Sequence, residues 1–210
     1  MVGSLFYLAA NIFVGIIYGT IATFQIERSV LLRELASRQY GLAAYFMVKN
    51  IIEFPIMIMF PLLTQLVVFW GAPYTNQPNE FWAFYLPLFL IAQCSVGFGV
   101  MVSASCKSLE TASELSNLVN LPAMFFGGLF SNGTSIVTGV KWIQYLSPIR
   151  YCFECLVRAN YGDTPDGDII YNLFGLNWGY WWCIAGLAVL VVVTRILSWV
   201  ILKYNVKYFA

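Results

Sequence analysis

The sequence contains no histidine, and only 10% of its 210 residues are charged. The absence of histidine removes the commonest metal ligand and the usual acid–base residue at neutral pH. Soluble domains carry roughly 25% charged residues, so this chain has too few polar side chains to cover a water-facing surface. Its net charge of +1 also argues against nucleic acid as a partner. The chain is 60% hydrophobic, with a mean hydropathy of +0.74, which indicates a protein whose solvent is lipid.

Sequence motifs for catalysis are also missing. No GxxxxGK[ST] phosphate-binding loop occurs, so we expect no ATP hydrolysis by this chain alone. The close cysteine pair Cys152-x-x-Cys155 is a weak zinc signal without histidines or a second pair, and we expect no metal site and no cofactor in this chain. An enzyme acting on lipid would need paired intramembrane carboxylates, a histidine cluster, or a nucleophile with its base. The sequence shows none of these, which disfavours that class.

Five stretches are long and apolar enough to cross a membrane, for which a helix needs about 20 residues. They are residues 3–26, 50–71, 81–105, 111–130 and 179–202. Lipid offers a bare backbone no hydrogen-bond partners, and the stretches are too long for barrel strands, so each is predicted to be a helix. The sequence therefore predicts an all-α polytopic membrane protein with a single transmembrane domain, residues 1–210.

Lysine and arginine in the short loops predict the orientation of such a protein. Basic residues follow the first, third and fifth stretches, and the loop after the second has none. They are Arg28, Arg33, Arg38, Lys107, Lys203 and Lys207. These flanks and the C-terminus are therefore expected to be cytoplasmic, and the connection 131–178 external. The N-terminus would then start outside without a cleaved signal peptide, so we expect a cytoplasmic part and a first helix to precede it, as in a partial gene sequence.

A compact charged segment, Gln25 to Pro55, joins the first two apolar stretches. Residues 27–40 are expected to form a short amphipathic helix and a turn. One interpretation is a helix lying on the membrane, with its arginines reaching the headgroups. Lys49 and Glu53 are four residues apart and are expected to pair on one helix face. The segment holds every charge of the first half of the chain except Glu80, namely Glu27, Arg28, Arg33, Glu34, Arg38, Lys49 and Glu53.

The residues of this segment also resemble a known family. The pattern E-R-x4-R-E-x2-S-x2-Y-x4-Y-F-x2-K-x5-P, which begins at Glu27 and ends at Pro55, is similar to the membrane domain of G-subfamily ABC transporters, the white and breast-cancer-resistance type. Three further matches follow in the same order along the chain. They are Phe126-Gly127-Gly128-Leu129-Phe130, the segment Leu146 to Tyr151 followed by Glu154, and the segment Arg195 to Leu202. The resemblance thus covers essentially the whole chain.

The resemblance implies a membrane half of an ATP-driven exporter of lipids, sterols or amphipathic compounds. Family members carry an N-terminal nucleotide-binding domain, where ATP and Mg²⁺ are expected to bind, and a first helix. Two such halves pair as a homo- or heterodimer. The charged segment is implied to be the cytoplasmic loop that packs on the ATPase domain and couples it to the membrane helices, through Glu27, Arg28, Arg33, Glu34 and Tyr40. The alternative is a non-transporting remnant or membrane scaffold, since the phosphate-binding loop is missing.

The family's substrate cavity is lined by helices that correspond to the first and fourth stretches. On the first, Tyr7, Asn11, Val14 and Tyr18 recur at helical spacing and can share one face. The resemblance implies that Asn11 lines the cavity, and that Phe13 or Val14 takes the place of a substrate-clamping aromatic residue. On the fourth stretch, the implied lining residues are Asn117, Leu121 and Met124. The resemblance also implies that Leu129 and Phe130 form a gate. Asn117 and Asn120 could equally serve as contacts between helices.

Three other positions carry expectations. Asn132 begins a glycosylation sequon, N-G-T, in the connection predicted to be external. Arg195 lies about two turns inside the end of its stretch and is expected to reach toward the cytoplasm. Cys152 and Cys155 would lie in an oxidising space, where one turn of helix places them poorly for bridging each other, so free thiols or one intermolecular bond are open.

Overall fold

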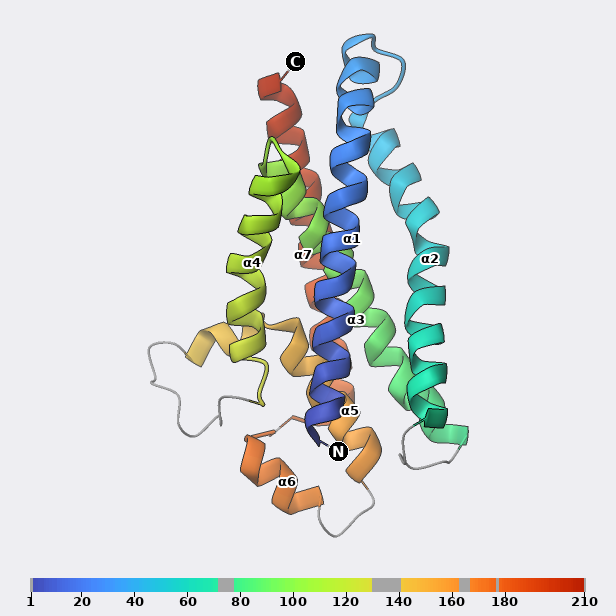
Figure 1. Ribbon diagram of the computed structural model, residues 1–210, viewed down its shortest axis with the longest axis vertical. Coiled ribbons are helices and arrows are strands. Elements are labelled where there is room, and N and C mark those ends of the chain that lie inside the picture. The colour runs from blue at the N-terminus through green and yellow to red at the C-terminus, as the bar shows by residue number, and fades with distance from the viewer. Residues whose placement is uncertain (1, 72–77, 130–140, 163–166, 177, 210) are drawn as a thin grey trace.

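The computed structural model describes residues 2–71, 78–129, 141–162, 167–176 and 178–209 as a bundle of helices (Figure 1). None of these residues lies in a strand, and the predicted all-α polytopic fold is confirmed. The elements are α1 (Val2–Ala36), α2 (Leu42–Gly71), α3 (Pro78–Ser105), α4 (Leu109–Phe125), the 3₁₀ helix η1 (Lys141–Leu146), α5 (Pro148–Tyr161), α6 (Gly167–Phe174) and α7 (Tyr180–Phe209).

Within the described residues, four helices are long and apolar enough to span a membrane: α1, α2, α3 and α7. The fourth predicted stretch, 111–130, is shorter in the structure, because α4 has 17 residues and ends at Phe125. Pro122 lies in its last turn, and Gly128 follows with a φ of 104°, a left-handed conformation that glycine adopts at little cost. The chain therefore leaves the helix before Leu129.

The ends of the helices alternate between two sides of the bundle (Figure 1). The turn between α1 and α2, the connection between α3 and α4, and the C-terminus lie at one end, the top of the view. The N-terminus, α5 and α6 lie at the other end. The basic residues used to predict the orientation, such as Arg33, Lys107 and Lys203, are thus placed at one end of the bundle.

The charged segment departs from its predicted bounds. Residues 27–36 form no separate helix; they continue α1 without a break, because the segment between Ile26 and Ala36 contains neither proline nor glycine. The helix ends where Arg38 adopts a φ of 55°, and α2 begins at Leu42, earlier than residue 50. The first span and residues 27–36, here called the arm, are therefore one continuous helix.

The centre of the bundle is α3, which packs against α1, α5 and α7. Two glycines permit these close approaches. A side chain at Gly97 would come within 2.5 Å of the Thr194 hydroxyl of α7, and one at Gly99 within 2.7 Å of Thr20 of α1. Ser198 of α7 also donates a hydrogen bond to the Gly97 carbonyl, at 2.7 Å. This part of the molecule is a tightly packed core.

The segment predicted to be an external loop contains a deeply buried helix. Nearly every residue of α5 is buried, against α1, α3 and α7. Phe153 meets Phe6 of α1 edge to face at 5.5 Å, and Ser147 donates a hydrogen bond to the Ala123 carbonyl of α4 at 2.7 Å. Phe153 also meets Phe174 of α6, so α5 joins the outer end of the bundle to the short helix beyond it.

Candidate coupling joint and transport face

A small group of acidic and basic side chains joins the arm of α1 to α2. The ammonium group of Lys49 lies 2.6 Å from a carboxylate oxygen of Glu27 on α1 and 3.1 Å from Glu53 on its own helix. The Tyr45 hydroxyl donates to the same Glu27 carboxylate at 3.0 Å. Lys49 is 9% exposed, while Glu27 is 48% exposed. The predicted Lys49–Glu53 pair is therefore one half of a joint between two helices.

The tip of the arm is held by local hydrogen bonds. The Tyr40 hydroxyl donates to the Glu34 carboxylate, and this bond, more than burial, raises the pKa of Tyr40 to about 12. The guanidinium of Arg28 donates to the carbonyl of Cys106, which fastens the arm to the α3–α4 connection. Arg33 is exposed. The residues implied for coupling therefore lie on an arm that is held in place by hydrogen bonds and ends in polar side chains.

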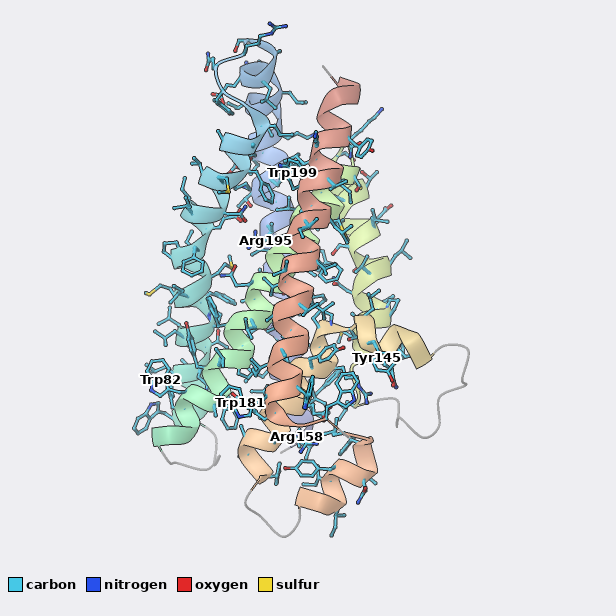
Figure 2. The ribbon with its side chains drawn as sticks, turned by 180° about the vertical axis from the view of Figure 1, so that it is seen from behind. Trp82, Tyr145, Arg158, Trp181, Arg195 and Trp199 are labelled. Atoms are coloured by element: carbon cyan, nitrogen blue, oxygen red, sulfur yellow. The ribbon has the colours of Figure 1, made fainter. Side chains whose placement is uncertain are left out.

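Arg195 forms a second polar connection, which the sequence reading missed. Its guanidinium donates to the side-chain carbonyl of Asn50 on α2 and, at 3.0 Å, to that of Gln93 on α3. Figure 2 shows Arg195 inside the span of α7, well away from either end. Two amides inside the bundle accept hydrogen bonds from it, and the expectation that it reaches toward the cytoplasm stays a prediction. The one signal in the sequence for this contact is that an arginine and two amide side chains lie within apolar stretches, where polar groups need partners.

An open groove separates α1 from α2 outside the joint. A cavity of about 550 Å³ is lined on one side by Gly15, Gly19 and Thr23, and on the other by Ile52 and Ile56 among others. The joint residues line the end of this cavity that lies nearer the turn between α1 and α2. A second cavity of about 370 Å³ continues between the helices at their other end.

The candidate residues on α1 point in different directions. Asn11 is exposed, and its amide N–H donates a long hydrogen bond to the Tyr7 hydroxyl oxygen, at 3.4 Å. Phe13 is 0% exposed and packs edge to face on Phe98 of α3, at 5.7 Å. Val14 is half-buried. Phe13 is therefore a core residue, and the open face of α1 carries no aromatic clamp at that level.

On α4, the two asparagines have different surroundings. Asn117 accepts a hydrogen bond from the Tyr18 hydroxyl of α1, on the open side of the two helices. Asn120 is buried and donates to Ser116 one turn earlier, at 3.2 Å. Leu121 is 54% exposed, and Met124 is half-buried against the core. The structure thus gathers Asn11, Asn117 and Leu121 on exposed helix faces and turns Asn120 inward.

Part of the predicted site cannot be placed. Leu129 is half-buried against the core, but its predicted gate partner Phe130 and the sequon residue Asn132 lie outside the described residues. Among the residues that the structure describes, no group of three or more cysteine, aspartate or glutamate side chains could hold a metal ion. The roles predicted for these residues stay predictions.

At the outer end, α5 binds the connection between α6 and α7. Glu154, whose side chain is 0% exposed, accepts a hydrogen bond from the backbone N–H of Trp178 at 2.5 Å and pairs with Arg158 at 3.3 Å. Burial raises the pKa of Glu154. Arg150 and Arg158 donate to the carbonyls of Gly175 and Leu176. Figure 2 shows Arg158 beside α6. These charged hydrogen bonds fix α6 and the residues after it, Gly175 and Leu176, to the bundle, and we call this region the cap.

These features define an integral membrane protein of the polytopic helical class, with one polar arm and one open helix face. The chain belongs to the ABC-2 type transporter family, whose profile matches residues 1–161. It is 30% identical over 171 residues to the protein white of Ceratitis capitata. The aligned region covers 81% of this chain and 25% of that protein.

Two further relatives agree with the family. The protein white of Drosophila melanogaster is 30% identical over 167 residues, covering 80% of this chain and 24% of that protein. The ABC transporter ATP-binding protein/permease wht-1 of Caenorhabditis elegans is 31% identical over 131 residues, covering 62% of this chain and 19% of that protein. The chain thus spans about a quarter of the length of the white proteins, and the predicted G-subfamily resemblance is confirmed.

Proposed function

We propose that this chain is the membrane half of an ATP-driven transporter that exports lipids, sterols or amphipathic small molecules. Membership of the ABC-2 type family supports a transporter membrane component. The observation that carries the coupling role is the joint between Glu27 and Lys49, because it connects an unbroken helical arm to a second membrane helix. The energy source is ATP with Mg²⁺, bound on a nucleotide-binding domain outside this chain.

The arm is built to transmit force. A continuous helix resists bending, so a push on the tip near Glu34 and Tyr40 moves α1 as a rod. The Glu27–Lys49 pair then carries the movement to α2, and Arg195 connects α2 to α7. In this mechanism, closure of the nucleotide-binding domains changes the angle between α1 and α2 and opens or closes the transport path.

The transport path is proposed to form where two such halves meet. The exposed faces of α1 and α4 carry Asn11, Asn117 and Leu121 beside small residues, and this mixture suits an amphipathic substrate better than a purely apolar one. Both a homodimer and a heterodimer satisfy this arrangement. Because the basic arm and the C-terminus share one end of the bundle, we place that end in the cytoplasm.

The test is reconstitution of this chain with its nucleotide-binding domain in liposomes. We expect vanadate-sensitive ATP hydrolysis and ATP-dependent movement of a fluorescent phospholipid or sterol. Arg33→Ala and Glu34→Ala should lower transport while the protein still folds, with the exposed Lys203→Ala at the end of α7 as the matched control. Full transport in both arm variants would refute coupling through the arm. Absence of any ATPase activity in the assembled protein would favour a non-transporting scaffold.

A further inference from the structure

The outer ends of α5 and α7 pack closely and in a definite register. A side chain on Gly186 of α7 would come within 2.6 Å of the ring of Tyr151 on α5. One turn further along α5, the Cys155 thiol donates to the carbonyl oxygen of Tyr180, at 3.7 Å. Residue numbers therefore fall along α7 as they rise along α5, so the two helices run antiparallel here.

This register brings two cysteines face to face. Cys183 lies three residues from both Tyr180 and Gly186, and hence on the side of α7 that faces α5. The Cys155 thiol reaches the carbonyl oxygen of Tyr180, three residues before Cys183 on α7, and both cysteines are 0% exposed. Both are thiols in this structure. Cys152, one turn earlier on α5, is also buried.

We propose that Cys155 and Cys183 form a disulfide bond that ties α5 to the outer end of α7. Such a bond needs Cα atoms about 4.4–6.8 Å apart, and a contact at a glycine such as Gly186 lets helices approach that closely. The two thiols lose two electrons and two protons, which reduce the disulfide of a thiol oxidoreductase in the oxidising compartment to two thiols. The proposal rests on the external placement of α5 given above.

Burial also determines when the bond forms. It raises the pKa of the Cys155 thiol, and only the thiolate attacks a disulfide. Oxidation therefore occurs while α5 is still docking against α7, and the finished bond is then shielded from reductants. The bond closes a loop from Cys155 to Cys183 that contains α6 and Trp178, so it adds a covalent link to the hydrogen bond that already holds Trp178 to Glu154.

The test is a thiol count on the full chain taken directly from its membranes. The protein is acid-quenched and denatured, free thiols are blocked with N-ethylmaleimide, and the thiols released by reduction are then labelled with polyethylene glycol maleimide. We expect two of the five cysteines to be labelled, and unreduced peptide mapping to recover Cys155 linked to Cys183. Five free thiols, or a linked peptide that contains Cys152 instead of Cys155, would overturn the proposal.

Variants provide the control. Cys155→Ser and Cys183→Ser should each abolish both labels, whereas Cys94→Ser, which removes a buried cysteine of α3, should keep both. The wild-type count decides the matter if a variant does not fold. If the thiols are free in membranes, oxidised glutathione is added to the purified, reduced protein. A bond that forms there would mean that the external placement of α5 is wrong. No bond would mean that Cys155 and Cys183 are not placed to form one. The count needs neither ATP nor transport, so failure of the proposed function leaves it unaffected.

Discussion

α2 and α3 are both apolar helices of membrane-spanning length, yet they are buried inside the bundle to very different extents. In their most apolar windows, 72% of α3 is buried inside the protein, against 11% of α2. α3 is enclosed by α1, α5 and α7, with glycine contacts to α1 and α7, whereas α2 packs chiefly on α3 and is tied elsewhere by Lys49 and Asn50. Similar composition therefore hides opposite roles: α3 is the fixed core, and α2 is a peripheral helix held largely by polar contacts.

The largest expected effect comes from crowding the core. Gly97→Leu would drive a side chain into Thr194, and overpacking of this kind costs about 1–3 kcal/mol. The melting temperature of the detergent-purified protein should fall by about 2–12 °C. The matched control is Gly15→Leu on the open groove, where nothing lies within 4 Å and the melting temperature should hold or rise. Equal losses in the two variants would erase the distinction between core and groove.

Arg195→Leu should have the next largest effect. It leaves the side-chain carbonyls of Asn50 and Gln93 without their donor inside the bundle, and an unsatisfied buried polar group costs about 1–3 kcal/mol. Thermal stability should fall, and the half of α2 that contains Asn50 should become more sensitive to protease. Lys203→Leu, at the exposed end of the same helix, is the control. If Arg195→Leu is as stable as wild type, the tether between α7 and α2 is unimportant.

The joint itself should contribute little to stability and much to coupling. Because Glu27 is 48% exposed, its pair with Lys49 is worth about 0.2–1 kcal/mol, which a double-mutant cycle of Lys49→Met with Glu27→Gln would measure. In the reconstituted transporter, Lys49→Met should hydrolyse ATP but move less substrate for each ATP. Unchanged stoichiometry would show that force reaches α2 by another route.

The smallest effect on stability is expected at the open face. Tyr18→Phe removes one hydroxyl that donates to Asn117, and such bonds between membrane helices average about 0.6 kcal/mol. The melting temperature should change by less than about 3 °C. Substrate preference should change more, because the freed Asn117 amide then faces the transport path. A large loss of stability would place this contact in the core.

The sequence was sufficient for the fold class and the family, and it located the charged segment. Composition and the five apolar stretches predicted helices in lipid, and the pattern from Glu27 to Pro55 indicated the G-subfamily. These are local signals: each depends on residues that are neighbours in the chain, so a single sequence carries them.

What the sequence could not provide depends on which helix faces which. The rotation of α1 about its axis decides whether Phe13 faces a cavity or packs on Phe98. Helical periodicity shows which residues share a face, but it does not show which helix packs against that face. The contact of Arg195 with Asn50 joins residues far apart in the chain. The burial of α5 likewise requires three other helices to be in place. Tertiary packing decides all three.

The most direct test of the account is a pair of spin-label distances in the transporter formed by this chain and its nucleotide-binding domain. One pair joins the exposed Ile52 of α2 to Ile196 of α7, and the reference pair joins Ser105 of α3 to Lys203 of α7. We predict that vanadate trapping changes the first distance and leaves the reference distance as it was. If both distances change together, or if neither changes, α2 is not the helix that ATP hydrolysis moves.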